Sequence, residues 1–130
     1  MLYAAIDIHK RRFQAAVFDS ESGAVSEQRF DASGEELRDW AVPLRGRVVA
    51  VAVEATTGWG WVWRELRVLG FDVRLADPSE VKALRGTAKR AKTDRLDARW
   101  LVVLLAKELL PESWLPPAEI QRLRDRTRLR

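Results

Sequence analysis

Apolar and polar positions in the first thirty residues predict three β-strands. Residues 2–8 form a mostly apolar run, residues 13–19 form a second one, and residues 25–30 alternate between apolar and polar. The segment "SESG" at 20–23 supplies turn residues between the last two runs. Short apolar runs separated by turns predict an antiparallel meander of three strands.

The pattern then changes to helical and apolar segments in alternation. Ser33 with Glu36 three residues later is a capping box, which predicts a helix from there to about Leu44. Residues 47–54, "RVVAVAVE", are apolar nearly throughout, as expected of a strand covered on both faces. The segment that follows predicts a helix capped by Thr57.

The strand at 47–54 and the helix after it belong to a strand–helix–strand unit. Gly70 ends the predicted helix, and 71–76, "FDVRLA", predicts another strand. The order strand, helix, strand predicts a parallel pair joined by a crossover. The predicted fold class is therefore α/β, a mixed sheet in which three antiparallel strands join parallel strands flanked by helices.

The C-terminal part reads as helices around a basic loop. A short helix is predicted at 80–84, a basic loop at 86–93, and a long helix from 94 to about 110. Pro116 and Pro117 open a last predicted helix. We expect one domain over 1–110, and over 111–130 the start of a linker or helical segment.

Composition and charge narrow the class of protein. The chain has 130 residues, no cysteine and a net charge of +4. Disulfides and thiolate metal sites are excluded, a cytoplasmic location is expected, and no apolar run is long enough to cross a bilayer. Residues 82–99 hold seven basic and two acidic side chains. Such a cluster indicates either a phosphate-binding surface or an ordinary solvated one.

Four carboxylates stand where metal chemistry is plausible. Asp7 interrupts the first apolar strand, where an unpaired carboxylate is costly to bury, and Glu54 ends the central strand. Asp94 and Asp97 share one face of the long helix. Each has a simpler interpretation: an ion pair with Lys10 or Arg11 for Asp7, a strand exit for Glu54, and favourable helix-start charges for the aspartates. Jointly, four oxygen donors without thiols suit Mg²⁺ or Mn²⁺.

Three segments also resemble a known family. "AIDIHKRRFQAAVFD", "VVAVAVEATTGWGW" and "KRAKTDRLDARWLVVL" are similar to the motif blocks of DEDD transposases of the insertion-sequence 110 family. The resemblance implies a RuvC-like domain with an RNase H fold. In it, Asp7, Glu54, Asp94 and Asp97 would be the catalytic carboxylates that bind Mg²⁺ (or Mn²⁺).

The resemblance also implies partners and a reaction. Members of the family move their own DNA element, guided by a structured bridge RNA, and a C-terminal domain supplies a nucleophilic serine. We expect this chain to end before that domain and to be inactive alone. The residues expected to contact DNA or RNA are Lys10, Arg11, Arg12, Lys89, Arg90, Lys92 and Arg95.

Two other classes of function stay open at this point. An actin-like or sugar-kinase-like ATPase lobe begins with a similar hairpin and aspartate, but "DIHKRR" lacks the glycines that wrap phosphate. A non-catalytic nucleic-acid-binding module is the second. His9 is expected to be structural, and the alternating tryptophans of "WGWVW" are expected to pack in the core. The apolar helix near residues 100–110 predicts a homo-oligomer.

Overall fold

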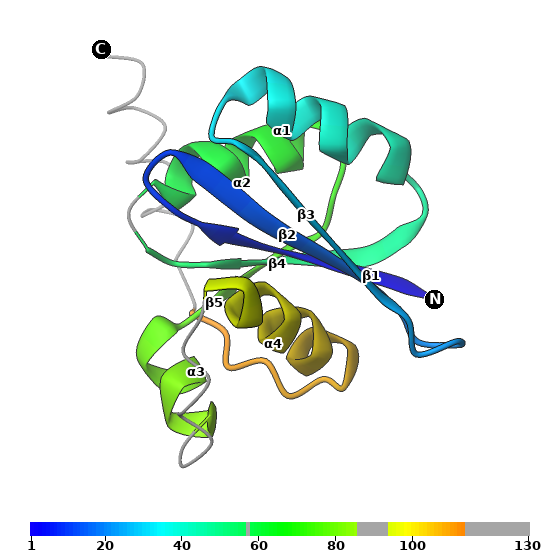
Figure 1. The fold of residues 1–130 in the computed structure, drawn as a ribbon, viewed down its shortest axis with the longest axis vertical. Helices are drawn as coiled ribbons and strands as arrows, with labels where there is room; N and C mark the ends of the chain where they lie inside the picture. Colours follow the sequence, from blue (N-terminus) through cyan, green and yellow to red (C-terminus); the bar gives the residue numbers. More distant parts are fainter. Residues whose placement is uncertain (57, 86–93, 114–130) are drawn as a thin grey trace.

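In the part of the chain that the structure describes, three consecutive strands come first, helices and two more strands then alternate, and the helices α3 and α4 follow (Figure 1). The computed structural model describes residues 1–56, 58–85 and 94–113, and of residues 82, 85 and 94–97 it describes the backbone alone. The strands are β1 Leu2–Ile8, β2 Arg12–Asp19, β3 Val25–Asp31, β4 Val48–Glu54 and β5 Val73–Ala76. The helices are α1 Gly34–Ala41, the 3₁₀ turn η1 Val42–Leu44, α2 Trp59–Val68, α3 Pro78–Arg85 and α4 Asp94–Ala106.

The strands form one mixed sheet in the order β3-β2-β1-β4-β5. The β1–β2 and β2–β3 pairs are antiparallel, whereas β1–β4 and β4–β5 are parallel. This confirms the predicted α/β class, with a three-stranded meander joined to a parallel pair. It also places β1 directly beside the central strand β4, so the first and fourth strands end at the same edge of the sheet.

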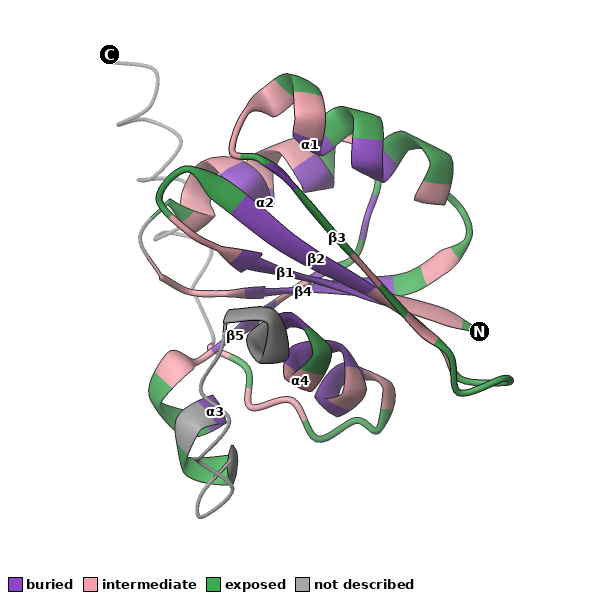
Figure 2. Cartoon of the chain, in the orientation of Figure 1, coloured by how far each residue is buried: buried purple, intermediate pink, exposed green. Residues whose placement is uncertain are grey.

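The two faces of the sheet carry side chains of different size. Toward α1 and α2 the sheet presents large residues, among them Ile6, Phe13 and Val51, all at most 1% exposed. Toward α4 the sheet presents only alanines as its fully buried apolar residues: Ala5, Ala16, Ala50, Ala52 and Ala76. Figure 2 shows buried residues on both sides of the sheet and along the inner side of α4. Because alanine is small, α4 packs close to the strands on this face.

Element boundaries differ from the sequence predictions in a few places. The helix opened by Ser33 ends at Ala41, and Val42–Leu44 tightens into a 3₁₀ turn around Pro43, which cannot donate a helical hydrogen bond. Strand β5 begins at Val73 rather than residue 71, and α4 ends at Ala106 rather than near 110. The predicted Thr57 cap is wrong: α2 begins at Trp59, and its N-cap is Gly58, which has a left-handed backbone and makes no side-chain cap. The basic loop 86–93 and the last helix lie outside the described residues.

The large apolar side chains that the structure describes on α4 pack against the rest of the domain. Leu101, Val102, Leu104 and Leu105 are buried in the cluster that α4 forms with the alanine face. Self-association through this helix stays a prediction. None of the apolar side chains described on α4 is exposed, so they do not support it. In the part of the chain that the structure describes, no helix is long and apolar enough to cross a membrane.

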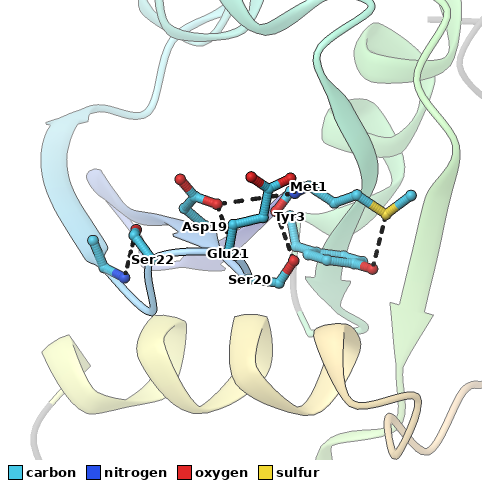
Figure 3. A network of polar contacts seen from close by, with 7 residues as sticks. Met1, Tyr3, Asp19, Ser20, Glu21 and Ser22 are labelled. Carbon is cyan, nitrogen blue, oxygen red and sulfur yellow. Dashed lines mark hydrogen bonds and ion pairs between the residues drawn. The ribbon is translucent and has the colours of Figure 1, made fainter.

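A polar network closes the edge of the sheet where β1 starts and β2 ends (Figure 3). The Met1 amino group lies 3.3 Å from Glu21 Oε2, and Ser20 Oγ donates to the Met1 carbonyl oxygen at 3.2 Å. The backbone N–H of Glu21 donates to Asp19 Oδ1 at 3.0 Å and lowers the pKa of that carboxyl. This network joins β1 to the β2–β3 turn, at the opposite end of the sheet from Asp7.

Candidate metal centre

Asp7 and Glu54 lie side by side on the α4 face of the sheet. Side chains alternate between faces along a strand, so Asp7 shares a face with Ala5, and Glu54 shares it with Ala52. Ala5 pairs with Ala52 and Ile6 with Val53, and the next step of this register brings Asp7 opposite Glu54. Neighbouring strands are about 4.8 Å apart, so the carboxylates can reach one ligand.

Asp7 is buried and has a specific partner. It is 2% exposed, and His9 Nε2 lies 2.8 Å from its Oδ2 atom, so the imidazole N–H donates to the carboxylate. Sequence analysis offered Lys10 or Arg11 as the partner; the structure places the hydrogen bond on His9 instead. An imidazole in this place fixes the orientation of the carboxylate, which is the role of a group hydrogen-bonded to a metal ligand.

The first turn of α4 starts at the same edge of the sheet. Figure 1 shows α4 beginning where β1 and β4 end and running back beneath the sheet. Ala98 packs in one cluster with Ala5, and Arg99 Nη1 bonds Glu27 Oε2 on β3 at 2.7 Å. From Ala98 back to Asp94 is four residues, about 6 Å of helix, and from Ala5 to Asp7 is two residues, about 6.6 Å of strand. We therefore expect the backbone of Asp94 near the level of Asp7.

Helical periodicity places both helix aspartates on the stripe that continues into the buried face. Asp94 precedes Ala98 by four residues, and Asp97 precedes Leu101 by four, and Ala98 and Leu101 are both fully buried against the sheet. The side chains of Asp94 and Asp97 are outside the described part, and only their positions along the helix are assigned. From this register we expect the four predicted positions at one edge of the sheet.

The structure adds two polar residues that sequence analysis missed. Gln14 is the Cα partner of Asp7 on β2, and Arg29 is the Cα partner of Gln14 on β3. Arg29, Gln14, Asp7 and Glu54 thus form one row across four strands, on the α4 face, and we call it the polar row. Gln14 stands in an apolar strand just as Asp7 does, and the same argument about buried polar groups would have identified it. For Arg29 the sequence carries no such signal.

The predicted nucleic-acid contacts are placed in part. Lys10 and Arg11 lie in the exposed turn between β1 and β2, and Arg12 begins β2. Lys10 and His9 also line a cavity of about 510 Å³ together with Phe13, Trp61 and neighbouring residues. Lys89, Arg90 and Lys92, and the side chain of Arg95, are outside the described residues. The three basic residues that the structure places therefore lie next to the C-terminal end of β1.

The donor chemistry of the site fits a hard cation. Asp7 and Glu54 offer oxygen ligands, which Mg²⁺ and Mn²⁺ prefer. Among the described side chains no group of three or more potential ligands is close enough to hold a metal ion. Asp7 and Glu54 alone would therefore be half a site. A complete one needs the carboxylates that the register of α4 directs to the same edge.

A five-stranded mixed sheet with helices on both faces, and with carboxylates at the ends of its first and central strands, is the α/β arrangement of RNase H-like domains. A family model described as "Transposase", that of the DEDD transposases of the insertion-sequence 110 family, matches residues 4–130. Since the match covers nearly the whole sequence, the chain belongs to this transposase family.

Other comparisons add little. The comparison with curated proteins finds no match. An exopolyphosphatase from Cytophaga hutchinsonii is similar at 14% identity and a TM-score of 0.46, over 70% of this chain and 39% of that one. The PPX-GPPA enzyme of Aquifex aeolicus is similar at 15% identity and a TM-score of 0.41, over 62% of this chain and 37% of that one. The chain thus spans well under half the length of either solved structure.

Proposed function

We propose that this chain is the metal-binding, RuvC-like domain of a DEDD transposase, and that it binds DNA and a structured guide RNA for RNA-guided transposition. The family match supports the transposase assignment. The observation that carries the metal site is the placement of Asp7 and Glu54 on adjacent parallel strands beneath the start of α4. This is the carboxyl edge of the strands, where ligands of α/β sheets gather.

Each protein group has a defined part in this proposal. Asp7, Glu54, Asp94 and Asp97 would hold Mg²⁺ or Mn²⁺, and His9 orients Asp7 through the 2.8 Å hydrogen bond. When bound, such ions polarise a phosphate and stabilise the charge that develops on its oxygens. Lys10, Arg11 and Arg12, exposed beside this edge, would contact the phosphates of the nucleic acid.

A thermal-denaturation titration with Mn²⁺ tests the metal half. Metal that binds only the folded chain stabilises it, by about 2.7 kcal/mol at one hundred times the dissociation constant. Asp7→Asn keeps an oxygen acceptor for His9 but removes the charge, so it should abolish most of this stabilisation. Asp39→Asn, an exposed position on α1 in the opposite layer, is the matched control and should keep it. A melting temperature unmoved by millimolar Mn²⁺ contradicts the proposal.

Nucleic-acid binding tests the other half and separates the alternatives. The chain should bind labelled DNA more tightly with Mn²⁺ than with a chelator, and Asp7→Asn should remove that difference. Binding that ignores metal favours a non-catalytic nucleic-acid-binding module. Binding of ATP in preference to DNA favours the ATPase lobe.

A further inference from the structure

The polar row contains a buried amide that holds an exposed guanidinium. Gln14 is 4% exposed, and Arg29 Nε donates to its Oε1 atom at 2.8 Å. Leaving a buried amide oxygen without a donor is unfavourable, so this hydrogen bond is needed for Gln14 to be buried. It also restricts Arg29, an otherwise flexible side chain on the exposed edge strand. The guanidinium is thus fixed in the row that ends at Asp7 and Glu54.

A small cavity opens beside this pair. Its volume is about 170 Å³, and it is lined by His9, Arg12, Phe13, Gln14 and Arg29. Within the described residues neither Arg12 nor Arg29 forms an ion pair with a carboxylate, although Asp31 is the Cα partner of Arg12. The cavity therefore has two guanidinium groups in its wall, and His9 connects it to Asp7.

We propose that this cavity is a subsite for a backbone phosphate of the nucleic acid, with Arg29 as its main ligand and Gln14 as the residue that positions Arg29. The inference rests on the proposed function, because it assumes that a nucleic-acid strand reaches the carboxylates. With Nε bonded to Gln14, the two terminal amino groups of Arg29 are the donors left for a phosphate. Such a contact positions the strand without reading its sequence.

The geometry suits a phosphate near the one at the metal site. Arg29 lies two strands from Asp7, a backbone separation of roughly 10 Å. A nucleic-acid strand that passes the C-terminal end of β1 would place one phosphate at the carboxylates and a neighbouring phosphate at the cavity. The guanidinium groups offset the repulsion between that phosphate and the carboxylates.

The test is fluorescence anisotropy of the full chain with fluorescein-labelled single-stranded DNA over a series of salt concentrations. Arg29→Gln is compared with Arg47→Gln, which loses the same charge at an exposed position before β4, at the other end of the sheet. Arg29→Gln should weaken binding by roughly fivefold to tenfold. It should also lower the slope of log affinity against log salt by about 0.7, the value for one phosphate contact on a single strand. Equal losses in affinity and slope for the two variants overturn the subsite.

The positioning role of Gln14 has a separate readout. Gln14→Met keeps the volume and removes the acceptor, so it should weaken binding, and Gln14→Met with Arg29→Gln should bind no worse than Arg29→Gln alone. Additive losses contradict the positioning role. If Gln14→Met does not fold, Arg29→Lys at the exposed position replaces it. Lysine keeps the charge but not the fork, so it should bind less tightly than the wild type, and wild-type affinity overturns the role of the held guanidinium.

Failure of this subsite and failure of the proposed function give different results. Wild-type chain that binds no DNA at any salt concentration contradicts the proposed function. Wild-type chain that binds DNA, with Arg29→Gln equal to Arg47→Gln, contradicts the subsite alone. Stabilisation by Mn²⁺ should persist in Arg29→Gln, because Arg29 is not a metal ligand.

Discussion

Ala5→Leu is the substitution that most sharply tests the close approach of α4 to the sheet. Ala5 is fully buried and lies between Ala16 and Ala52 in a row directly beneath α4. The same strand carries Asp7 two residues later. Leucine adds three carbon atoms where alanine already fills the space, so the helix has to move away from the strands.

The expected cost follows from overpacking of a filled core. Inserting methylene groups into such a site destabilises a protein by about 1–3 kcal/mol. For a domain of this size each kcal/mol lowers the melting temperature by roughly 4 °C, so the expected shift is about 4–12 °C. Displacement of α4 also moves the backbone of Asp94 away from Asp7. Affinity for Mn²⁺ should therefore fall, and this fall is separate from the loss of stability.

Ala4→Leu is the matched control. Ala4 is equally buried, but it faces the cluster beneath α1 and α2. It should destabilise the fold by a similar amount and leave the affinity for Mn²⁺ unchanged. Urea denaturation of both variants measures stability, and calorimetric titration at a temperature where both are folded measures affinity. An unchanged stability in Ala5→Leu, or an equal loss of affinity in both variants, refutes the reasoning.

Three further predictions concern the scaffold. Leu101→Ala removes a fully buried side chain from α4 and should cost about 2–5 kcal/mol in urea denaturation; a cost below 1 kcal/mol would show that α4 is loosely held. Ser33→Ala removes the oxygen that accepts from the Glu36 N–H at 3.2 Å and should cost about 1 kcal/mol, whereas Ser33→Asp should not. Hydrogen bonds from the Ser79 hydroxyl and the Glu80 N–H lower the pKa of Asp77 below its ordinary value of 3.8. The stabilisation of the fold by ionised Asp77 is therefore fully present above pH 3.8, and it is lost as the pH falls through the lowered pKa. The difference in melting temperature between wild type and Asp77→Ala should vanish in strong acid, and a constant difference would exclude the linkage.

The sequence predicted the sheet because its strands are strongly patterned. Residues 47–54 are apolar on both faces, and in the structure β4 is covered on both sides. Asp7 and Glu54 were identified because each interrupts or ends such a strand. Their adjacency followed from the expected strand order, and the register of β1 and β4 confirms it.

Other features depend on contacts between distant segments, which local pattern does not contain. The His9–Asp7 hydrogen bond depends on how the chain leaves β1, where lysine and arginine were equally plausible partners. The position of Arg29 depends on the β2–β3 register, which sets it opposite Gln14. Periodicity showed that α4 is apolar but not what covers it. That answer came from the alanine face, whose five alanines lie on four different strands.

Calorimetric titration of Mn²⁺ into the wild type, Asp7→Asn, Glu54→Gln, Asp94→Asn and Asp97→Asn tests the central claim most directly, with Asp39→Asn as the control. A shared site predicts that each of the four variants loses at least about tenfold in affinity, since even groups that only orient a ligand are worth that much. The control should bind like the wild type. Wild-type affinity in Asp94→Asn and Asp97→Asn, beside a loss in Asp7→Asn, would show that α4 does not contribute to the site and would contradict the account.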